Sequence, residues 1–105
     1  MYKYTINAKV RRAPIRKIVY STIMPYYVYI AECADKTLYT GITTDIVRRE
    51  QQHNGERRGG AIYTASKRPV HIVYSEQYDT RSEALKREYD IKQLTKKQKM
   101  LMVTS

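Results

Sequence analysis

The chain has 105 residues, with 20 basic and 10 acidic side chains that give a net charge of +10. Its length favours a single domain with a modest core, and its charge favours a polyanionic partner, with nucleic acid ahead of an anionic membrane surface. One cysteine and two histidines exclude an internal disulfide and a tetrahedral Cys/His zinc cluster, and no apolar run is long enough to cross a membrane.

Residues 1–24 form a basic N-terminal arm ahead of the domain expected at residues 25–105. The arm contains six of the 20 basic residues and none of the 10 acidic ones, so it holds +6 of the net charge of +10. Apolar and basic residues alternate around Pro14 without a helical period, and we expect the arm either to add an edge strand or to remain flexible. Met24 offers a second translation start, which would make the residues before it dispensable.

Two β-prone runs, at residues 26–33 and 38–42, flank a polar segment and predict a β-hairpin. Tyr29 and Tyr39 share one face of this hairpin only if opposed residue numbers have an even sum, because side chains alternate along a strand. A loop of three or five residues, or a bulge, would meet this condition, and Gly41 is where we expect a bend or bulge. The alternative is that both tyrosines are ordinary core or surface residues.

A short helix is predicted at residues 46–52, between the N-cap residues of segment 43–45 and the stop signal Asn54-Gly55. Residues three and four apart lie on one stripe of a helix. That stripe carries Ile46, Arg49 and His53. The simpler alternatives are that Arg49 forms a surface ion pair and that His53 is a cation favoured by the helix C-terminus.

Residues 54–69 form the longest segment without a clean period, which predicts a functional or mobile loop. Four cations and one aromatic ring in or next to this loop are typical of a surface that contacts phosphates and stacks a base. These residues are Arg57, Arg58, Tyr63, Lys67 and Arg68. A solvated loop is the alternative.

Three further elements complete the predicted domain. Residues 70–78 form a third strand, and the capping box at residues 80–83 begins a helix. A second capping box at residues 95–98 begins a short final helix. The inward stripe of the helix that begins at residues 80–83 runs through Ala84, Leu85, Glu88, Ile91 and Leu94.

Glu88 is the only charged residue in this apolar stripe. A carboxylate there is costly unless it meets a cation or a metal ion. The alternative to a metal site is a salt bridge to Arg49 or Lys92.

Taken together, these residues resemble the motifs of the GIY-YIG nuclease superfamily. Tyr27-Val28-Tyr29 matches the first motif, with Tyr27 where the family has glycine, and Tyr39-Thr40-Gly41 matches the second. The family's arginine, histidine and metal-binding glutamate match Arg49, His53 and Glu88. The resemblance extends from about Tyr26 to Val103 and is greatest to small stand-alone members, which are similar to the N-terminal nuclease domain of UvrC.

The resemblance implies an α+β fold, in which three or more helices flank a three-stranded antiparallel sheet. It implies that Tyr29 orients or deprotonates water, that Tyr39 joins the same hydrogen-bond network, and that His53 relays the proton. It also implies that Arg49 grips the phosphate and that Glu88 holds Mg²⁺, for which Mn²⁺ can substitute. Lys67 is the candidate for the extra basic group that some members carry in the middle loop.

The implied function is a metal-dependent DNA endonuclease, structure-directed or weakly sequence-specific, acting in DNA repair or recombination. Its partners would be DNA and a protein that supplies targeting, with no membrane. It would act in the cytoplasm of a bacterium, or in the nucleus or cytoplasm of the host of a virus. The alternatives are a non-catalytic nucleic-acid-binding module on the same fold and a protein-interaction domain.

Overall fold

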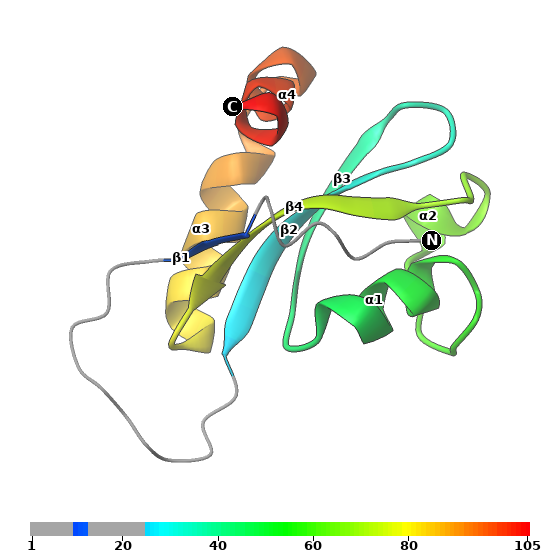
Figure 1. Ribbon diagram of the computed structural model, residues 1–105, viewed down its shortest axis with the longest axis horizontal. Coiled ribbons are helices and arrows are strands. Elements are labelled where there is room, and N and C mark those ends of the chain that lie inside the picture. The colour runs from blue at the N-terminus through cyan, green and yellow to red at the C-terminus, as the bar shows by residue number, and fades with distance from the viewer. Residues whose placement is uncertain (1–9, 13–24) are drawn as a thin grey trace.

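The computed structural model describes residues 10–12 and 25–105, which form a sheet with helices on both faces (Figure 1). The sheet has four strands in the order β1-β4-β2-β3. The strands are β1 (Val10–Arg12), β2 (Tyr26–Glu32), β3 (Leu38–Thr43) and β4 (His71–Tyr78). The helices are α1 (Ile46–His53), α2 (Ile62–Ala65), α3 (Arg81–Lys92) and α4 (Lys96–Thr104). Strands β2, β3 and β4 are the predicted antiparallel sheet, and the α+β fold is confirmed.

The hairpin of β2 and β3 has the register that the two tyrosines require. Tyr29 lies opposite Gly41 and Tyr39 lies opposite Ala31, so the two tyrosines share one face of the sheet. The Cys33 amide donates to the Thr37 carbonyl at 2.9 Å, which leaves a three-residue turn between them. Lys36 ends that turn with φ 71°, the left-handed conformation typical of such hairpins. The three-residue loop is one of the lengths that a shared face requires, so the condition stated from the sequence is met.

The bend or bulge predicted at Gly41 is wrong. The register between β2 and β3 is constant through Gly41, and the irregularity of the sheet lies instead between Ile30 and Ala31, where β2 meets β4. A Cβ atom on Gly41 would lie 2.6 Å from the Oη atom of Tyr29. Glycine occupies this position because the Tyr29 ring packs against the backbone of β3.

Three residues of the basic arm take the first of the two alternatives, an edge strand. Strand β1 pairs in parallel with β4, with Val10 opposite Ser75. The rest of the arm, residues 1–9 and 13–24, lies outside the described residues, and so does the expectation about a start at Met24.

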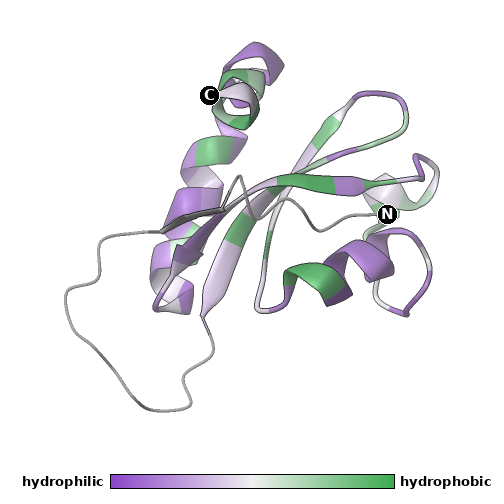
Figure 2. Cartoon of the chain, in the orientation of Figure 1, coloured by the Kyte–Doolittle hydropathy of each residue, from purple (hydrophilic) through white to green (hydrophobic). Residues whose placement is uncertain are grey.

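Alternation along β2 separates two hydrophobic cores, one on each face of the sheet. The core under α3 contains Val28, Ile30, Tyr74, Ala84 and Ile91. The core under α1 contains Tyr29, Ala31, Cys33, Val70 and Ile72. Figure 2 shows hydrophobic residues along the middle of β4 and mostly hydrophilic residues over α3. Tyr29 therefore stands in the core that α1 covers.

The predicted cap signals set the helix boundaries. Asp45 accepts a hydrogen bond from the Arg48 amide at 3.0 Å and begins α1, and Asn54 caps its end. Thr80 and Thr95 cap α3 and α4. Helix α2 was not predicted. It lies inside residues 54–69, which lack a clean period and were expected to form a loop. Among the described helices, none is long and apolar enough to span a membrane.

A partly buried ion pair between Arg87 and Glu76 sets the rotation of α3 against the sheet. Glu76 of β4 is 6% exposed and accepts hydrogen bonds from Arg87 Nε at 2.8 Å, Tyr78 Oη at 2.7 Å and Tyr74 Oη. Burial raises the pKa of Glu76, but the hydrogen bonds from Arg87, Tyr74 and Tyr78 outweigh it and hold that pKa below its ordinary value. Successive helix residues point about 100° apart. Fixing Arg87 therefore also fixes the direction of its neighbour, Glu88.

Candidate active site

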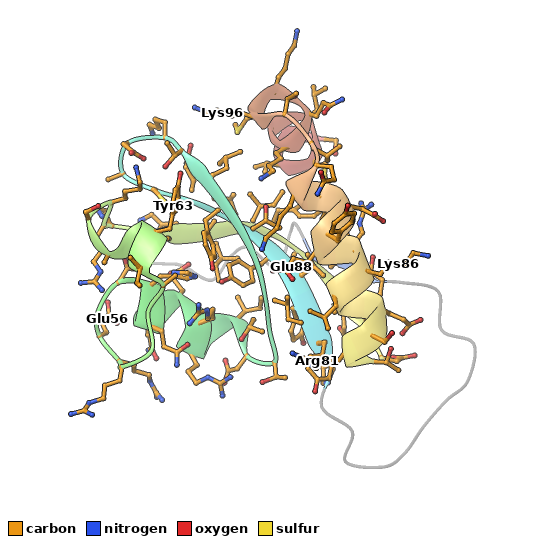
Figure 3. All side chains as sticks on the ribbon, turned by 180° about the vertical axis from the view of Figure 1, so that it is seen from behind. Glu56, Tyr63, Arg81, Lys86, Glu88 and Lys96 are labelled. Atoms are coloured by element: carbon orange, nitrogen blue, oxygen red, sulfur yellow. The ribbon has the colours of Figure 1, made fainter. Side chains whose placement is uncertain are left out.

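A pocket of about 390 Å³ lies at the β3 edge of the sheet. Four of the five predicted catalytic residues line it, namely Tyr29, Tyr39, Arg49 and Glu88. They come from β2, β3, α1 and α3, so the pocket is lined by residues from both faces of the sheet. In Figure 3, Glu88 lies on the side of α3 that faces β3, whereas Lys86 points away from the sheet. Among the tyrosines that begin β2, Tyr26 lines the pocket, and Tyr27, which replaces the family's glycine, does not.

Tyr29 is the centre of the hydrogen-bond network at this site. Its side chain is fully buried, and its Oη atom lies 2.7 Å from Nε2 of His53. Arg49 donates from Nε to the same Oη atom at 3.1 Å. The predicted stripe of α1 thus brings the fifth predicted catalytic residue, His53, into contact with Tyr29, although His53 does not itself line the pocket.

The simpler alternatives for Arg49 and His53 are both wrong. Arg49 Nη1 donates to the Gln52 side chain at 3.0 Å and to the Gly59 carbonyl at 2.6 Å. The guanidinium is thus held by neutral groups rather than by a surface carboxylate. His53 is fully buried, and burial lowers its pKa to about 4, helped by the charges of Arg49 and Arg68. His53 is therefore a neutral imidazole at neutral pH, not a cation at a helix end.

Burial raises the pKa of Tyr29 above its ordinary value, and the hydrogen bond and charge of Arg49 lower it by less. Tyr29 is therefore a phenol at neutral pH. Its hydroxyl lies against an uncharged imidazole that can accept a proton. The pair forms a hydrogen-bonded contact that leads from the pocket, which Tyr29 lines, to the buried imidazole.

His53 is expected to make the folded protein less stable in mild acid. The unfolded chain binds a proton at an ordinary histidine pKa of about 6.5, whereas the folded pKa is about 4. The neutral His53 ring contributes its full stability above the unfolded pKa of about 6.5. The free energy of unfolding falls by about 3 kcal/mol as the pH decreases from about 6.5 to about 4. NMR titration of the His53 ring should give a midpoint near pH 4. A midpoint at the ordinary value would contradict the burial argument.

Three aromatic rings lead from this network to the surface. The Tyr39 ring lies 6.3 Å from the Tyr29 ring, and it stacks on Tyr63 at 5.9 Å with an interplanar angle of 27°. Within the described part of the chain, Tyr39 meets Tyr29 by ring contact rather than by the expected hydrogen bond. The side chain of Tyr63 ends the series and is 47% exposed.

Glu88 is a single carboxylate at the opposite wall of the pocket. Its side chain is 17% exposed and lies 3.2 Å from Lys92 Nζ, so the salt bridge proposed as the alternative is present. Leu85, predicted to point into the core, is 37% exposed and lines the pocket beside it. No group of three His, Cys, Asp or Glu side chains among residues 10–12 and 25–105 is placed to enclose a metal ion. The site fits a cation such as Mg²⁺, which keeps most of its waters and takes few protein ligands.

The five predicted nucleic-acid contacts divide into two groups. Arg57, Arg58 and Tyr63 are exposed on the segment that follows α1. Lys67 instead pairs with Asp35 at 2.7 Å, and Arg68 donates from Nε to the His53 carbonyl at 2.7 Å. Lys67 and Arg68 therefore hold the loop against the hairpin and α1.

Thr64 and Arg81 are the residues near the site that sequence reasoning missed. Thr64 is fully buried in α2, and its Oγ1 atom lies 2.8 Å from His53 Nδ1. Arg81, the first residue of α3, also lines the pocket. A threonine in an aperiodic segment and an arginine inside a capping box carry no sequence signal for a site.

The comparisons with known proteins agree with this geometry. The model of the GIY-YIG catalytic domain matches residues 25–101. Two proteins of Staphylococcus aureus, named UPF0213 protein (strain Mu3) and UPF0213 protein SA0446 (strain N315), are 50% identical over 78 residues, which is 74% of this chain and 93% of theirs. The solution structure of the protein EF2693 from E. faecalis is 37% identical, with a TM-score of 0.52 over 76% of this chain and 83% of that one. A match of the catalytic-domain model to residues 25–101 of the 105 shows that the chain belongs to the GIY-YIG family.

Proposed function

We propose that this protein is a metal-dependent DNA endonuclease that hydrolyses phosphodiester bonds. The observation that carries the proposal is the Tyr29 hydroxyl, held between Arg49 and His53 in a pocket whose other wall is Glu88. Phosphodiester hydrolysis needs a group that takes the proton of the attacking water and positive charge beside the phosphate. The pocket provides both on rigid elements.

The proton steps follow from the protonation states of Tyr29 and His53. Tyr29 Oη accepts a proton from the attacking water as its own proton passes to His53 Nε2, 2.7 Å away. The transfer ends with a neutral phenol and an imidazolium, so no phenolate needs to exist beforehand. The P–O bond to the leaving oxygen breaks as the bond from the attacking water forms, and the leaving oxygen takes a proton from solvent. His53 returns its own proton to solvent through Tyr29 once the DNA product leaves.

Arg49 has two tasks in this scheme. Its Nε orients Tyr29, and its Nη1 is engaged by Gln52 and Gly59. We assign the remaining nitrogen, Nη2, to a non-bridging phosphate oxygen, which a lysine could not reach while also holding Tyr29. Arg49 thus couples the position of the phosphate to the position of Tyr29.

Glu88 would hold Mg²⁺, with Mn²⁺ able to substitute. When bound, such an ion stabilises the charge that develops on the phosphate and on the leaving oxygen. Lys92 neutralises Glu88 at 3.2 Å, so its ammonium must move aside when the carboxylate binds a divalent cation. The side chain of Lys92 is 51% exposed, so its ammonium can turn toward solvent when it leaves Glu88.

DNA would enter over the segment that follows α1. Arg57 and Arg58 are exposed there and suit phosphates, and the exposed ring of Tyr63 suits a base. Lys67 and Arg68 would either exchange their contacts with Asp35 and the His53 carbonyl for phosphate contacts, or keep these contacts and hold the loop in place. These contacts carry little base-specific information, so we propose structure-directed or weakly sequence-specific cleavage in DNA repair or recombination, with a partner protein supplying any finer targeting.

The Glu88–Lys92 salt bridge favours one second candidate, a DNA-binding module without catalysis. In that case Lys92 would be the permanent partner of Glu88, and no metal would enter.

DNA cleavage assays separate these two functions. We expect wild-type protein to cut labelled single-stranded, duplex or branched DNA with Mg²⁺ and not with EDTA. Glu88→Gln should bind the same DNA and cut none. Asp90→Asn is the matched control, because it removes the same charge from an exposed residue of the same helix. Binding without cleavage in every condition would establish the binding module instead.

We propose a cytoplasmic location. The S. aureus relatives are bacterial, and the chain's single cysteine, Cys33, is buried and unpaired, which suits a reducing compartment.

A further inference from the structure

Helix α2 places one hydroxyl against the proton path. Thr64 is fully buried, although its neighbours Ile62 and Tyr63 are 94% and 47% exposed. Its Oγ1 atom lies 2.8 Å from His53 Nδ1 and 3.1 Å from the Ala61 carbonyl oxygen. Thr64 therefore contacts the imidazole on the side opposite Tyr29.

The hydrogen atoms of this chain of contacts can be assigned by elimination. A carbonyl oxygen only accepts, so the single hydroxyl proton of Thr64 goes to Ala61. Thr64 Oγ1 must then accept from His53, and Nδ1 must carry the proton. A neutral imidazole has one N–H group, so Nε2 presents a lone pair to Tyr29.

The other side of the chain agrees with this assignment. Arg49 Nε donates to Tyr29 Oη, and Tyr29 donates its own proton to His53 Nε2. With the opposite tautomer, Arg49 and His53 would both donate to Oη. Thr64 would also have to abandon Ala61 to supply a proton to Nδ1. The observed contacts satisfy every donor only in the first arrangement.

We propose that Thr64 is a positioning residue, which holds His53 in the Nδ1–H tautomer and so keeps Nε2 ready to accept the proton of Tyr29. The tautomer rests on contacts alone, whereas its effect on rate rests on the proposed nuclease function. Thr64 belongs to the segment at residues 54–69 that was predicted to be a loop. That segment would then contribute to catalysis through the contact of Thr64 with His53, apart from any contact with DNA.

The tautomer can be measured without DNA by ¹⁵N NMR of the two histidine rings. We expect wild-type His53 to show a protonated Nδ1 and a bare Nε2. Thr64→Val keeps the side-chain shape and removes the acceptor, so the population should shift toward the Nε2–H form. Thr64→Ser keeps the hydroxyl and should restore the wild-type spectrum. His71, whose side chain is 62% exposed, provides the second ring signal for reference.

Single-turnover cleavage then tests the effect on rate. Thr64→Val should slow cleavage about 10- to 100-fold, the range for removing an outer partner that orients a histidine, with unchanged DNA affinity. Thr64→Ser should recover most of the rate. The control is Thr40→Val, because Thr40 is 3% exposed and its Oγ1 atom has no hydrogen-bond partner among the described residues. Thr40→Val should cut at the wild-type rate.

The NMR result decides the proposal even if the protein proves not to be a nuclease. An Nε2–H tautomer in wild-type His53, or an unchanged tautomer in Thr64→Val, would overturn it. If Thr64→Val fails to fold, the wild-type and Thr64→Ser spectra decide, and an Nε2–H form in either one overturns it. A wild-type protein that cuts no DNA would refute only the nuclease function.

Discussion

Tyr29→Phe is expected to slow DNA cleavage about 10³-fold, the middle of the range for losing a group that transfers protons in the transition state. The change removes one atom, Oη, on which Arg49 Nε and His53 Nε2 both converge. Without it the attacking water has no proton acceptor in contact with His53. Single-turnover cleavage with Mg²⁺ measures the loss, and DNA affinity should change by less than about 2-fold, because the proposed contacts of Arg57, Arg58 and Tyr63 with DNA are unchanged.

The same substitution should reduce stability moderately. It leaves Arg49 Nε and His53 Nε2 without their partner in a buried site, at a cost of about 1 to 3 kcal/mol in the free energy of unfolding. Urea unfolding measures this cost, and cleavage is assayed where the variant remains folded. Tyr89→Phe is the matched control, since Tyr89 is 66% exposed on α3 and loses the same hydroxyl. A Tyr29→Phe protein that keeps more than a tenth of the wild-type rate would rule out Tyr29 as the proton acceptor.

The sheet and the residues on its two faces could be predicted because local rules decide them. The period of two along a strand reduced the question of a shared face for Tyr29 and Tyr39 to the length of the loop, and the three-residue loop puts them on one face. The period of α1 put Arg49 and His53 on one stripe, and both reach Tyr29. The assignment of a residue to one face of a strand or one stripe of a helix follows from local periodicity and requires no distant contact.

Residues whose role depends on distant contacts were not predictable. Glu50 looks like a solvated helix residue, yet it is 7% exposed and accepts the Ile72 amide at 2.7 Å. Asn54, predicted only as a helix stop, also accepts the Val70 amide at 2.6 Å. Together they tie α1 to the beginning of β4. The stripe of α1 that carries Arg49 and His53 is therefore held in place by polar side chains whose partners are 16 and 22 residues away.

The basic loop shows the same limit from the other direction. Composition marked Lys67 and Arg68 as phosphate contacts, whereas in the structure they bind Asp35 and the His53 carbonyl. Arg68 thereby satisfies a carbonyl at the end of α1 and adds to the positive charge around His53. A cation in a loop can hold the fold together or bind DNA, and sequence alone does not separate the two roles.

Gly41→Ala is expected to damage both folding and catalysis, although it adds a single methyl group. Its Cβ would lie 2.6 Å from Tyr29 Oη and 2.8 Å from Tyr29 Cζ, well inside contact distance. The ring cannot turn aside easily, because it is fully buried and its hydroxyl is bonded to Arg49 and His53. Overpacking of this kind costs about 1 to 3 kcal/mol of stability, measured by urea unfolding.

Cleavage by Gly41→Ala should fall about 10²-fold, since displacing a reacting group by about 1 Å has that effect. A double-mutant cycle with Tyr29→Phe identifies the cause. If Gly41 acts by giving room to the Tyr29 hydroxyl, then Gly41→Ala should slow the already impaired Tyr29→Phe protein by less than about 3-fold. Losses that multiply fully in the double variant would instead mean that Gly41 serves the substrate directly. The glycine of the second motif would then shape the pocket for DNA rather than position the tyrosine of the first.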